Sequence, residues 1–318
     1  MKKRVIYEIK GLYRDNFRVT GYEFGSGEKS VCIVGSMRGN EIQQLYCCSM
    51  LVKRFKQLEE DGKLLPGHQV LIIPCVNPYS MNTKKRFWSV DNTDINRMFP
   101  GYDQGETTQR IADGVFRVIS EYKYGIQYTS FYMPGEFLPH VRLMATGFED
   151  LDLARQFGMP YVVRRAVRPF DTTTLNYNWQ LWETHAFSMY TTTTTNIDKQ
   201  SAKESVGCIL NFLKRRGIVD YHGHDGYISR VVEDTDLVSV PTKTSGIFES
   251  VVKVGEEVER GQLLARILDC YEGEIIEELR APVDGIVFFM HGEPLTYSQT
   301  AVFKLIVHKE WDMTERHA

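Results

Sequence analysis

The pattern of apolar and polar residues is most informative between Val31 and Phe55. Residues 31–34 form an unbroken apolar run, which is typical of a strand buried on both faces. A short polar turn bracketed by two glycines follows, and from Glu41 onward apolar side chains recur at helical spacing. This stretch predicts a buried strand that turns sharply into an amphipathic helix.

A second apolar run, residues 69–75, follows that helix and predicts another buried strand. The two strands and the helix then form a βαβ unit, in which the strands lie parallel. A long polar loop, residues 77–101, comes directly after the second strand. Because long loops without secondary structure are uncommon inside compact domains and the carboxyl edge of a parallel sheet is the usual place of active sites, we expect this loop to be functional.

The rest of the chain divides into two parts with different patterns of apolar and polar residues. Helices are expected over 106–122 and 201–215, with strands over 124–131 and 187–196, the last of them rich in threonine. From about residue 237 the chain changes to short β-like runs punctuated by glycine, which suggest hairpins in a small, flattened barrel or sandwich. We therefore expect an α/β domain over residues 1–225 and a β-barrel domain over residues 226–318.

Composition and charge limit the kinds of partner that the protein can bind. The 318 residues carry a formal net charge of −3, so no basic surplus favours nucleic acid or an anionic membrane. No apolar run approaches the roughly 20 residues of a membrane span, and the amino terminus lacks the apolar core of a signal peptide. The six cysteines lack the spacing of a zinc knot and are interpreted as small core residues. We expect a cytoplasmic protein without nucleic-acid or membrane partners.

Two motifs resemble those of a known family. The first is Arg38-Gly39-Asn40-Glu41, in the turn after the first buried strand, and the second is the block Asp-Ile-Asn-Arg-Met-Phe-Pro-Gly at residues 94–101. They resemble the succinylglutamate desuccinylase/aspartoacylase family, relatives of the zinc carboxypeptidases. The resemblance implies a three-layer, zinc-carboxypeptidase-like α/β domain with a mostly parallel central sheet, followed by a small barrel like those of biotinyl and lipoyl domains. It also implies hydrolysis of the amide bond of N-acyl amino acids by a zinc-bound water.

The resemblance places the metal ligands at three positions, of which only Glu41 keeps a suitable residue. Arg38 stands where the family has histidine, and a guanidinium has no lone pair to give a metal. Thr129 stands at the second histidine position, and a threonine hydroxyl is a poor zinc ligand. Thr194 is our best match for the glutamate that serves as general base, a role that threonine cannot fill near pH 7. We expect Arg38 to replace the missing metal charge by pairing with Glu41, either directly or through a bound ligand.

The substrate-binding residues of the family have better counterparts in this sequence. Carried over by position, Arg86 polarises the scissile carbonyl, and Asn96 and Arg97 bind the carboxylate end of the substrate. A guanidinium suits this role because it presents paired donors to a carboxylate. The alternative for Arg97 is a structural ion pair with Asp94 that holds the loop.

Two more residues resemble a substrate-side strand of the family, His140 and Arg142 in the sequence Pro-His-Val-Arg. They are candidates for the polar part of the pocket, although a hydrogen-bonded histidine on a strand is the alternative for His140. The barrel lacks a lysine over residues 269–280, where a carrier domain would hold its prosthetic group. We therefore expect the barrel to cover the pocket or to mediate a homo-oligomer.

Two functions follow from these residues. The first is a deacylase-like hydrolase of a small carboxylated N-acyl amino acid or amide, with zinc implied by the family resemblance and held at a displaced site. The second is a catalytically inactive relative, a pseudoenzyme without metal, that binds or senses a similar small carboxylate in the same pocket.

Overall fold

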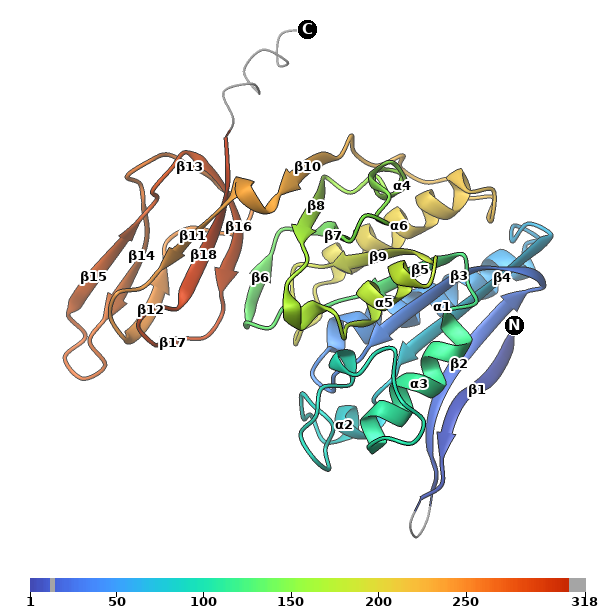
Figure 1. Cartoon of the computed structure of the whole chain (residues 1–318). Helices are drawn as coiled ribbons and strands as arrows, with labels where there is room; N and C mark the ends of the chain where they lie inside the picture. The colour runs from blue at the N-terminus through green and yellow to red at the C-terminus, as the bar shows by residue number, and fades with distance from the viewer. Residues whose placement is uncertain (12–14, 309–318) are drawn as a thin grey trace, which may run out of the picture. The chain divides into compact units, whose positions relative to one another are not determined.

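The computed structural model describes residues 1–11 and 15–308, which form two compact units. The first unit is Met1–Ser130 with Pro139–Val231, and the second is Phe131–Leu138 with the residues from Val232 onward (Figure 1). Within the described part of the chain, no helix has the length and apolar character needed to cross a membrane. The sequence did not reveal that a short segment inside the α/β part, residues 131–138, belongs to the second unit.

A nine-stranded mixed sheet forms the centre of the first unit. Its strand order is β1-β2-β4-β3-β5-β9-β7-β8-β10, and the pairs β4–β3, β3–β5 and β5–β9 at its centre are parallel. The strands are β1 (Lys2–Ile9), β2 (Phe17–Gly25), β3 (Gly27–Ser36), β4 (Gly67–Cys75), β5 (Tyr124–Tyr128), β7 (His140–Ala145), β8 (Tyr161–Ala166), β9 (His185–Tyr190) and β10 (Arg230–Glu233).

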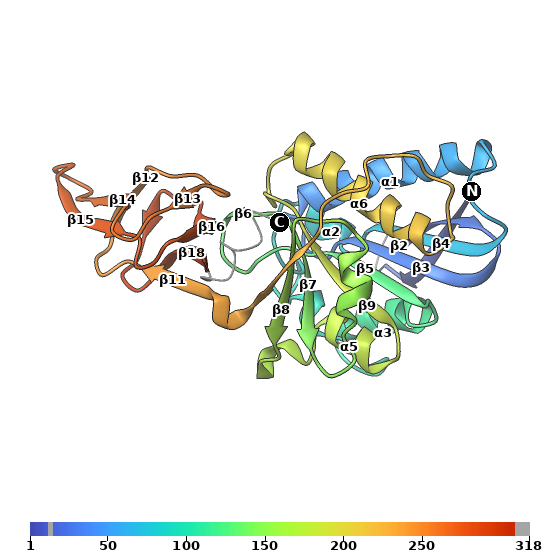
Figure 2. The ribbon, with the colours of Figure 1, turned by 90° about the horizontal axis from the view of Figure 1, so that it is seen from above.

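Helices cover both faces of this sheet, which gives three layers. Figure 2 shows α1 and α6 on one side of the sheet and α3 and α5 on the other, and the two faces have separate apolar cores. The helices are α1 (Ile42–Glu60), α2 (Pro78–Asn82), α3 (Thr107–Ile119), α4 (Leu151–Arg155), α5 (Leu175–Leu181) and α6 (Lys199–Arg215), with short 3-10 turns η1 (Ile95–Arg97), η2 (Pro169–Asp171) and η3 (Asp234–Asp236). The expected three-layer α/β architecture is confirmed.

The βαβ unit predicted from the first two apolar runs is present as β3, α1 and β4. The predicted strand residues 31–34 are fully buried, and Ile33 lies in register with Ile72 of the parallel neighbour. These strands carry apolar side chains on both faces because a helical layer covers each face of the sheet.

The strand expected over residues 187–196 is wrong beyond Tyr190, where β9 ends. After this residue the threonine hydroxyls bond to nearby backbone carbonyls. Thr191 Oγ1 donates to the carbonyl of Thr193 at 3.1 Å, and Thr193 Oγ1 donates to that of Asn196 at 2.8 Å. Such local side-chain bonds compete with sheet pairing, so a threonine run with high β-propensity forms a turn here.

The second unit consists of two small antiparallel sheets around their own apolar core. One sheet has the order β11-β18-β16-β13, with β6 paired to β16, and the other has the order β15-β14-β12-β17. The strands are β6 (Gly135–Phe137), β11 (Leu237–Pro241), β12 (Gly246–Ser250), β13 (Glu257–Val258), β14 (Leu263–Leu268), β15 (Ile275–Arg280), β16 (Gly285–His291), β17 (Leu295–Thr296) and β18 (Ala301–Val307).

Candidate functional site

The turn between β3 and α1 forms the centre of the candidate site. Gly39 allows this turn to pack tightly, because a Cβ added there would come within 2.2 Å of the backbone of Ser80 and 2.3 Å of that of Lys85. The N–H of Gly39 also donates to the carbonyl of Arg86 at 3.0 Å. The long loop after β4 is therefore fastened directly to the turn that carries Arg38 and Glu41.

The Glu41 carboxylate is 1% exposed and holds the turn together. Its Oε2 accepts the backbone N–H groups of Met37 at 2.7 Å and Arg38 at 3.0 Å. Its Oε1 accepts Arg38 Nη1 at 2.9 Å and the hydroxyl of Ser130, which follows β5. Four donors thus surround one buried carboxylate.

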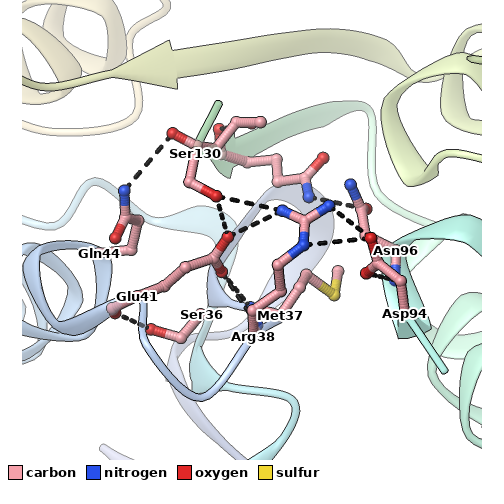
Figure 3. A network of polar contacts seen from close by, with 10 residues as sticks. Ser36, Met37, Arg38, Glu41, Gln44, Asp94, Asn96 and Ser130 are labelled. Carbon is pink, nitrogen blue, oxygen red and sulfur yellow. Dashed lines mark hydrogen bonds and ion pairs between the residues drawn. The ribbon is translucent and has the colours of Figure 1, made fainter. Parts of the chain in front are cut away.

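The Arg38 guanidinium bridges two carboxylates, as Figure 3 shows. Besides its bond to Glu41, it donates to Asp94 Oδ2 from Nη2 at 2.8 Å and from Nε at 3.1 Å. Its Nη1 also lies 3.1 Å from the hydroxyl of Ser130. The direct ion pair predicted between Arg38 and Glu41 is confirmed, and it extends to Asp94, for which no contact with Arg38 was predicted.

Charge and burial shape this network. Burial alone would lower the pKa of Arg38, but the carboxylates of Glu41 and Asp94 outweigh it, so the pKa is raised and the guanidinium stays charged. The pKa of Arg86 is lowered, first by burial and then by the charge of Arg38. The guanidinium groups of Arg38 and Arg86 and the carboxylates of Glu41 and Asp94 therefore lie close enough to influence one another electrostatically.

Asn96 lies beside this network and is tied to β5. Asp94 caps η1 by accepting the N–H of Asn96 at 3.0 Å, and the Asn96 side-chain carbonyl accepts Gln127 Nε2 at 3.0 Å. Asn96 and Gln127 are both almost fully buried. The η1 turn is thus fixed against the carboxyl end of β5.

The side chain of Arg97 contacts residues 170 and 171 and not Asp94, the partner considered for it from the sequence. Its Nη1 donates to the carbonyl of Phe170 at 2.5 Å and lies 3.7 Å from Asp171 Oδ1. Because Asp94 pairs with Arg38 instead, the alternative that Arg97 pairs with Asp94 is wrong. The Arg97 side chain remains 33% exposed, which leaves it accessible.

His140 and Arg142 lie together on β7, where they contact Tyr190 of β9. The His140 ring stacks on that of Tyr190 with 4.6 Å between centroids, and Arg142 Nη2 lies 3.1 Å from His140 Nε2. Arg142 also lies over the tyrosine ring and donates to its hydroxyl at 3.2 Å. A guanidinium has only donors, so Nε2 is the acceptor and His140 carries its proton on Nδ1 in this contact. His140 is therefore a hydrogen-bonded histidine on a strand, as the alternative to a pocket role proposed.

The two threonines predicted for catalytic positions make local contacts. Thr129 Oγ1 donates to the carbonyl of Gln127 at 3.2 Å, and Thr194 accepts the N–H of Gln43 through its backbone carbonyl at 3.0 Å. The side chains that the two strand ends present to the charged groups are instead Ser130 and Tyr190. Sequence reasoning missed both of these.

A third residue of the site that was not predicted, Gln127, did have a signal in the sequence. Gln127 is a polar residue in an otherwise apolar strand, and such a residue is buried only when it has a hydrogen-bond partner. Ser130 and Tyr190 carried no comparable signal, because their roles depend on which strands become neighbours.

These features define an α/β protein with charged and polar side chains gathered at the carboxyl ends of central parallel strands. The model of the succinylglutamate desuccinylase/aspartoacylase catalytic domain matches residues 27–128, which include all of the Arg38–Glu41–Asp94 network except Ser130. Residues 27–128 are therefore similar to the catalytic domain of the succinylglutamate desuccinylase/aspartoacylase family.

Several relatives resemble this chain over most of its length. It is 24% identical over 288 residues to the N-alpha-acetyl-L-2,4-diaminobutyric acid deacetylase of Halomonas elongata, covering 85% of this chain and 79% of that protein. A succinylglutamate desuccinylase/aspartoacylase from Rhodobacter sphaeroides has a TM-score of 0.77 at 21% identity, covering 93% and 90% of the two chains. A succinylglutamate desuccinylase from Silicibacter sp. has a TM-score of 0.80 at 19% identity, covering 96% and 93%. These structures share the fold.

The family is zinc-dependent, but the residues at this site do not fit a zinc ion. A carboxylate offers about four acceptor positions, and those of Glu41 are taken by two backbone N–H groups, by Arg38 and by Ser130. Arg38 itself has no lone pair to donate. Within residues 1–11 and 15–308, no group of three or more His, Cys, Asp or Glu side chains is arranged to hold a metal.

Proposed function

We propose that this chain is a metal-free binding relative of the family's deacylases, which recognises a small carboxylated N-acyl amino acid or amide without hydrolysing it through zinc. One observation carries the proposal. The guanidinium of Arg38 lies between the carboxylates of Glu41 and Asp94, at the position that the resemblance assigns to a zinc ligand.

The substitution is physically self-consistent. A buried carboxylate without a countercharge is costly, and removing a metal from beside Glu41 would leave one. A guanidinium restores the charge and supplies directed donors, but it cannot lower the pKa of a bound water by coordination as a metal does. The network therefore keeps the electrostatics of the pocket and loses the means of making a nucleophile.

The candidates for recognition are arginines from three different elements. Arg86 follows α2 on the loop fastened to the turn, Arg97 ends η1, and Arg142 lies on β7. Arginine suits carboxylates because its donors form a fork of matching geometry. The relative from Halomonas elongata is named as a deacetylase of an N-acetyl amino acid, which supports this ligand class.

The first test measures metal and ligand together. We expect the purified protein, loaded with Zn²⁺ and then passed over a desalting column, to retain far less than one zinc per chain. Calorimetric titration with N-acetyl-L-aspartate, N-succinyl-L-glutamate and a panel of other N-acyl amino acids is expected to give saturable binding of at least one compound. No release of the free amino acid is expected in the same solutions.

Two results would overturn the proposal. One is zinc near one equivalent per chain with hydrolysis that a chelator abolishes, which would restore the deacylase with a displaced metal site. The other is the absence of saturable binding across the panel.

A further inference from the structure

The second unit presents apolar side chains on the outer face of one of its two sheets. This sheet has the strand order β15-β14-β12-β17, and Figure 1 shows the four strands side by side. Its inner face contributes to the apolar core of the unit through Ile267 of β14, which is in register with Phe248 of β12. Successive side chains of a strand point to opposite faces, so the next registered pair, Ile247 and Leu268, points away from that core.

The apolar pair extends across the whole sheet. Leu268 is also in register with Ile275 of β15. Ile247 is also in register with Leu295 of β17. Residues directly opposite one another in antiparallel strands share a face, so these four side chains form one outward row, which we call the apolar row. At its two ends, Leu295 is 62% and Ile275 is 52% exposed.

Such a row is unusual on an outer face. In packed pairs of sheets the inward side chains form the core, and the outward ones are normally polar. Single apolar residues are common on protein surfaces, whereas a contiguous group that crosses four strands is typical of an interaction site.

A second row of outward side chains is charged. Two residues along β14 from the apolar row, Arg266 is in register with Glu249 of β12 and with Glu278 of β15. We call these three residues the charged row. Arg266 Nη1 lies 3.9 Å from Glu249 Oε2, and an exposed ion pair of this length is weak, so both groups can pair with a partner. The row has more acid than base, which disfavours a nucleic acid or an anionic membrane as that partner.

The two rows are self-complementary under a two-fold rotation. The midpoint of the sheet lies between β14 and β12, with two strands on either side. A two-fold axis that runs along the strands at this midpoint brings β14 of one copy onto β12 of the other, and β15 onto β17. Leu268 then faces the partner's Ile247, and Arg266 faces the partner's Glu249. A symmetric dimer interface needs this kind of self-complementarity, because the same surface serves on both copies.

We propose that this sheet face binds a second copy of the chain in a two-fold symmetric dimer. The apolar rows of the two copies pack against each other, and their removal from water drives the association. The charged rows fix the orientation, because Arg266 of each copy pairs with the other copy's Glu249. Four strands about 4.8 Å apart span only about 14 Å. The interface is therefore smaller than a standard one, and the dimer dissociates on dilution.

Analytical ultracentrifugation of the full chain over a range of concentrations tests the proposal. We expect a reversible equilibrium between monomer and dimer. Leu295→Glu and Ile275→Glu each place a charge at one end of the apolar row and should raise the dissociation constant of the dimer at least about tenfold. Because both side chains are more than half exposed, the Tm of each variant should stay close to that of the wild type. The matched control is Ile197→Glu, at an isoleucine of the first unit that is 49% exposed, which should leave the dissociation constant unchanged.

An exchange of charges tests the two-fold geometry itself. Arg266→Glu makes the charged row wholly acidic, and Glu249→Arg gives it two cations, so each variant should dimerise more weakly than the wild type. Mixed in equal amounts, the two variants should form a heterodimer at least about tenfold tighter than either homodimer, because every facing pair then joins opposite charges. A dimer contact elsewhere on the chain would give no such recovery.

Three results would overturn the inference. They are a wild type that stays monomeric at every concentration, a dimer that neither Leu295→Glu nor Ile275→Glu weakens, and the absence of a heterodimer from the mixed charge variants. The first would leave the face to a different protein. None of them affects the proposed function, because ligand binding is measured separately and its candidate residues lie in the first unit.

Discussion

Arg38 and Asp94 are 56 residues apart in the chain and are joined by two hydrogen bonds, 2.8 Å and 3.1 Å long, to one carboxylate oxygen. The bonds connect the turn before α1 to the long loop after β4. Because the same guanidinium also pairs with Glu41, one cation holds two segments that would otherwise present two carboxylates to each other. The arrangement makes Arg38 a structural residue of the site, and its replacement tests the proposal directly.

Replacing Arg38 by methionine should destabilise the fold strongly. The change leaves the buried carboxylate of Glu41 without its countercharge, and breaking a buried pair in this way costs about 3–5 kcal/mol. Urea denaturation at pH 7 gives the free energy of unfolding. In the double variant Arg38→Met/Glu41→Gln the loss should be clearly smaller than the sum of the two single losses, because the unpaired charge is absent.

The matched control for this cycle is Arg18→Met, which removes the exposed pair between Arg18 and Glu8. Its Tm should equal that of the wild type. An Arg38→Met variant as stable as Arg18→Met would contradict the buried network.

Replacing Arg38 by histidine should create a metal site that the wild type lacks. The shorter side chain vacates the space between the carboxylates of Glu41 and Asp94, both of which contact the guanidinium, and adds a nitrogen ligand. We expect zinc to raise the Tm of Arg38→His and to leave that of the wild type unchanged. Arg38→Ala, which opens the same space without a third ligand, is the control and should respond much less.

Arg97 is expected to serve recognition more than stability. Its side chain is 33% exposed, so Arg97→Ala should cost no more than about 1 kcal/mol of unfolding free energy. The same variant should lose most of the thermal stabilisation that a bound N-acyl amino acid gives to the wild type. A variant that keeps the full ligand-induced shift would show that Arg97 only holds Phe170 and Asp171 in place.

The control for Arg97 is a neighbouring arginine on the same carboxylate. Arg165 pairs with Asp171 and is more buried than Arg97. Arg165→Ala should therefore reduce Tm more than Arg97→Ala does, while the relative shift on ligand addition persists.

Local patterns in the sequence were enough for the layered fold and for the pairing of Arg38 with Glu41. The apolar runs of β3 and β4 and the helical spacing of α1 are local features, and the two charged residues are three positions apart. The contact of Arg38 with Asp94 and the position of Tyr190 beside Arg142 could not be read in this way. They depend on the folding of a long loop and on the antiparallel pairing of β7 with β9, which no local pattern specifies.

The buried thiols predict a loss of stability at high pH. Burial raises the pKa of Cys75 and of Cys208 to about 12, while the unfolded chain ionises near 9. Between these values the unfolded state loses thiol protons that the folded state keeps, so the free energy of unfolding falls as pH rises from about 9 to 12. In Cys75→Ala the fall between pH 8 and 10 should be smaller than in the wild type.

Thiol labelling offers a separate check on these cysteines. Cys270 is exposed, whereas the other five are buried or partly buried. A thiol reagent at pH 8 should modify one cysteine quickly, and Cys270→Ser should abolish that fast phase. Rapid modification of several thiols in the folded protein would contradict the raised pKa values.

His291 of β16 predicts an opposite dependence in the second unit. Burial lowers its pKa despite the opposing charge of Glu293, and neither ring nitrogen has a partner within residues 1–11 and 15–308. As the pH falls below about 6.5, this histidine takes up a proton in the unfolded chain more readily than in the folded chain. The free energy of unfolding is therefore highest above that pH and decreases as the pH falls. His291→Phe, which places a ring beside Phe248, should lose less stability between pH 7 and 5 than the wild type. A His291→Phe variant that loses as much stability as the wild type between these pH values would rule out burial of His291 as the cause.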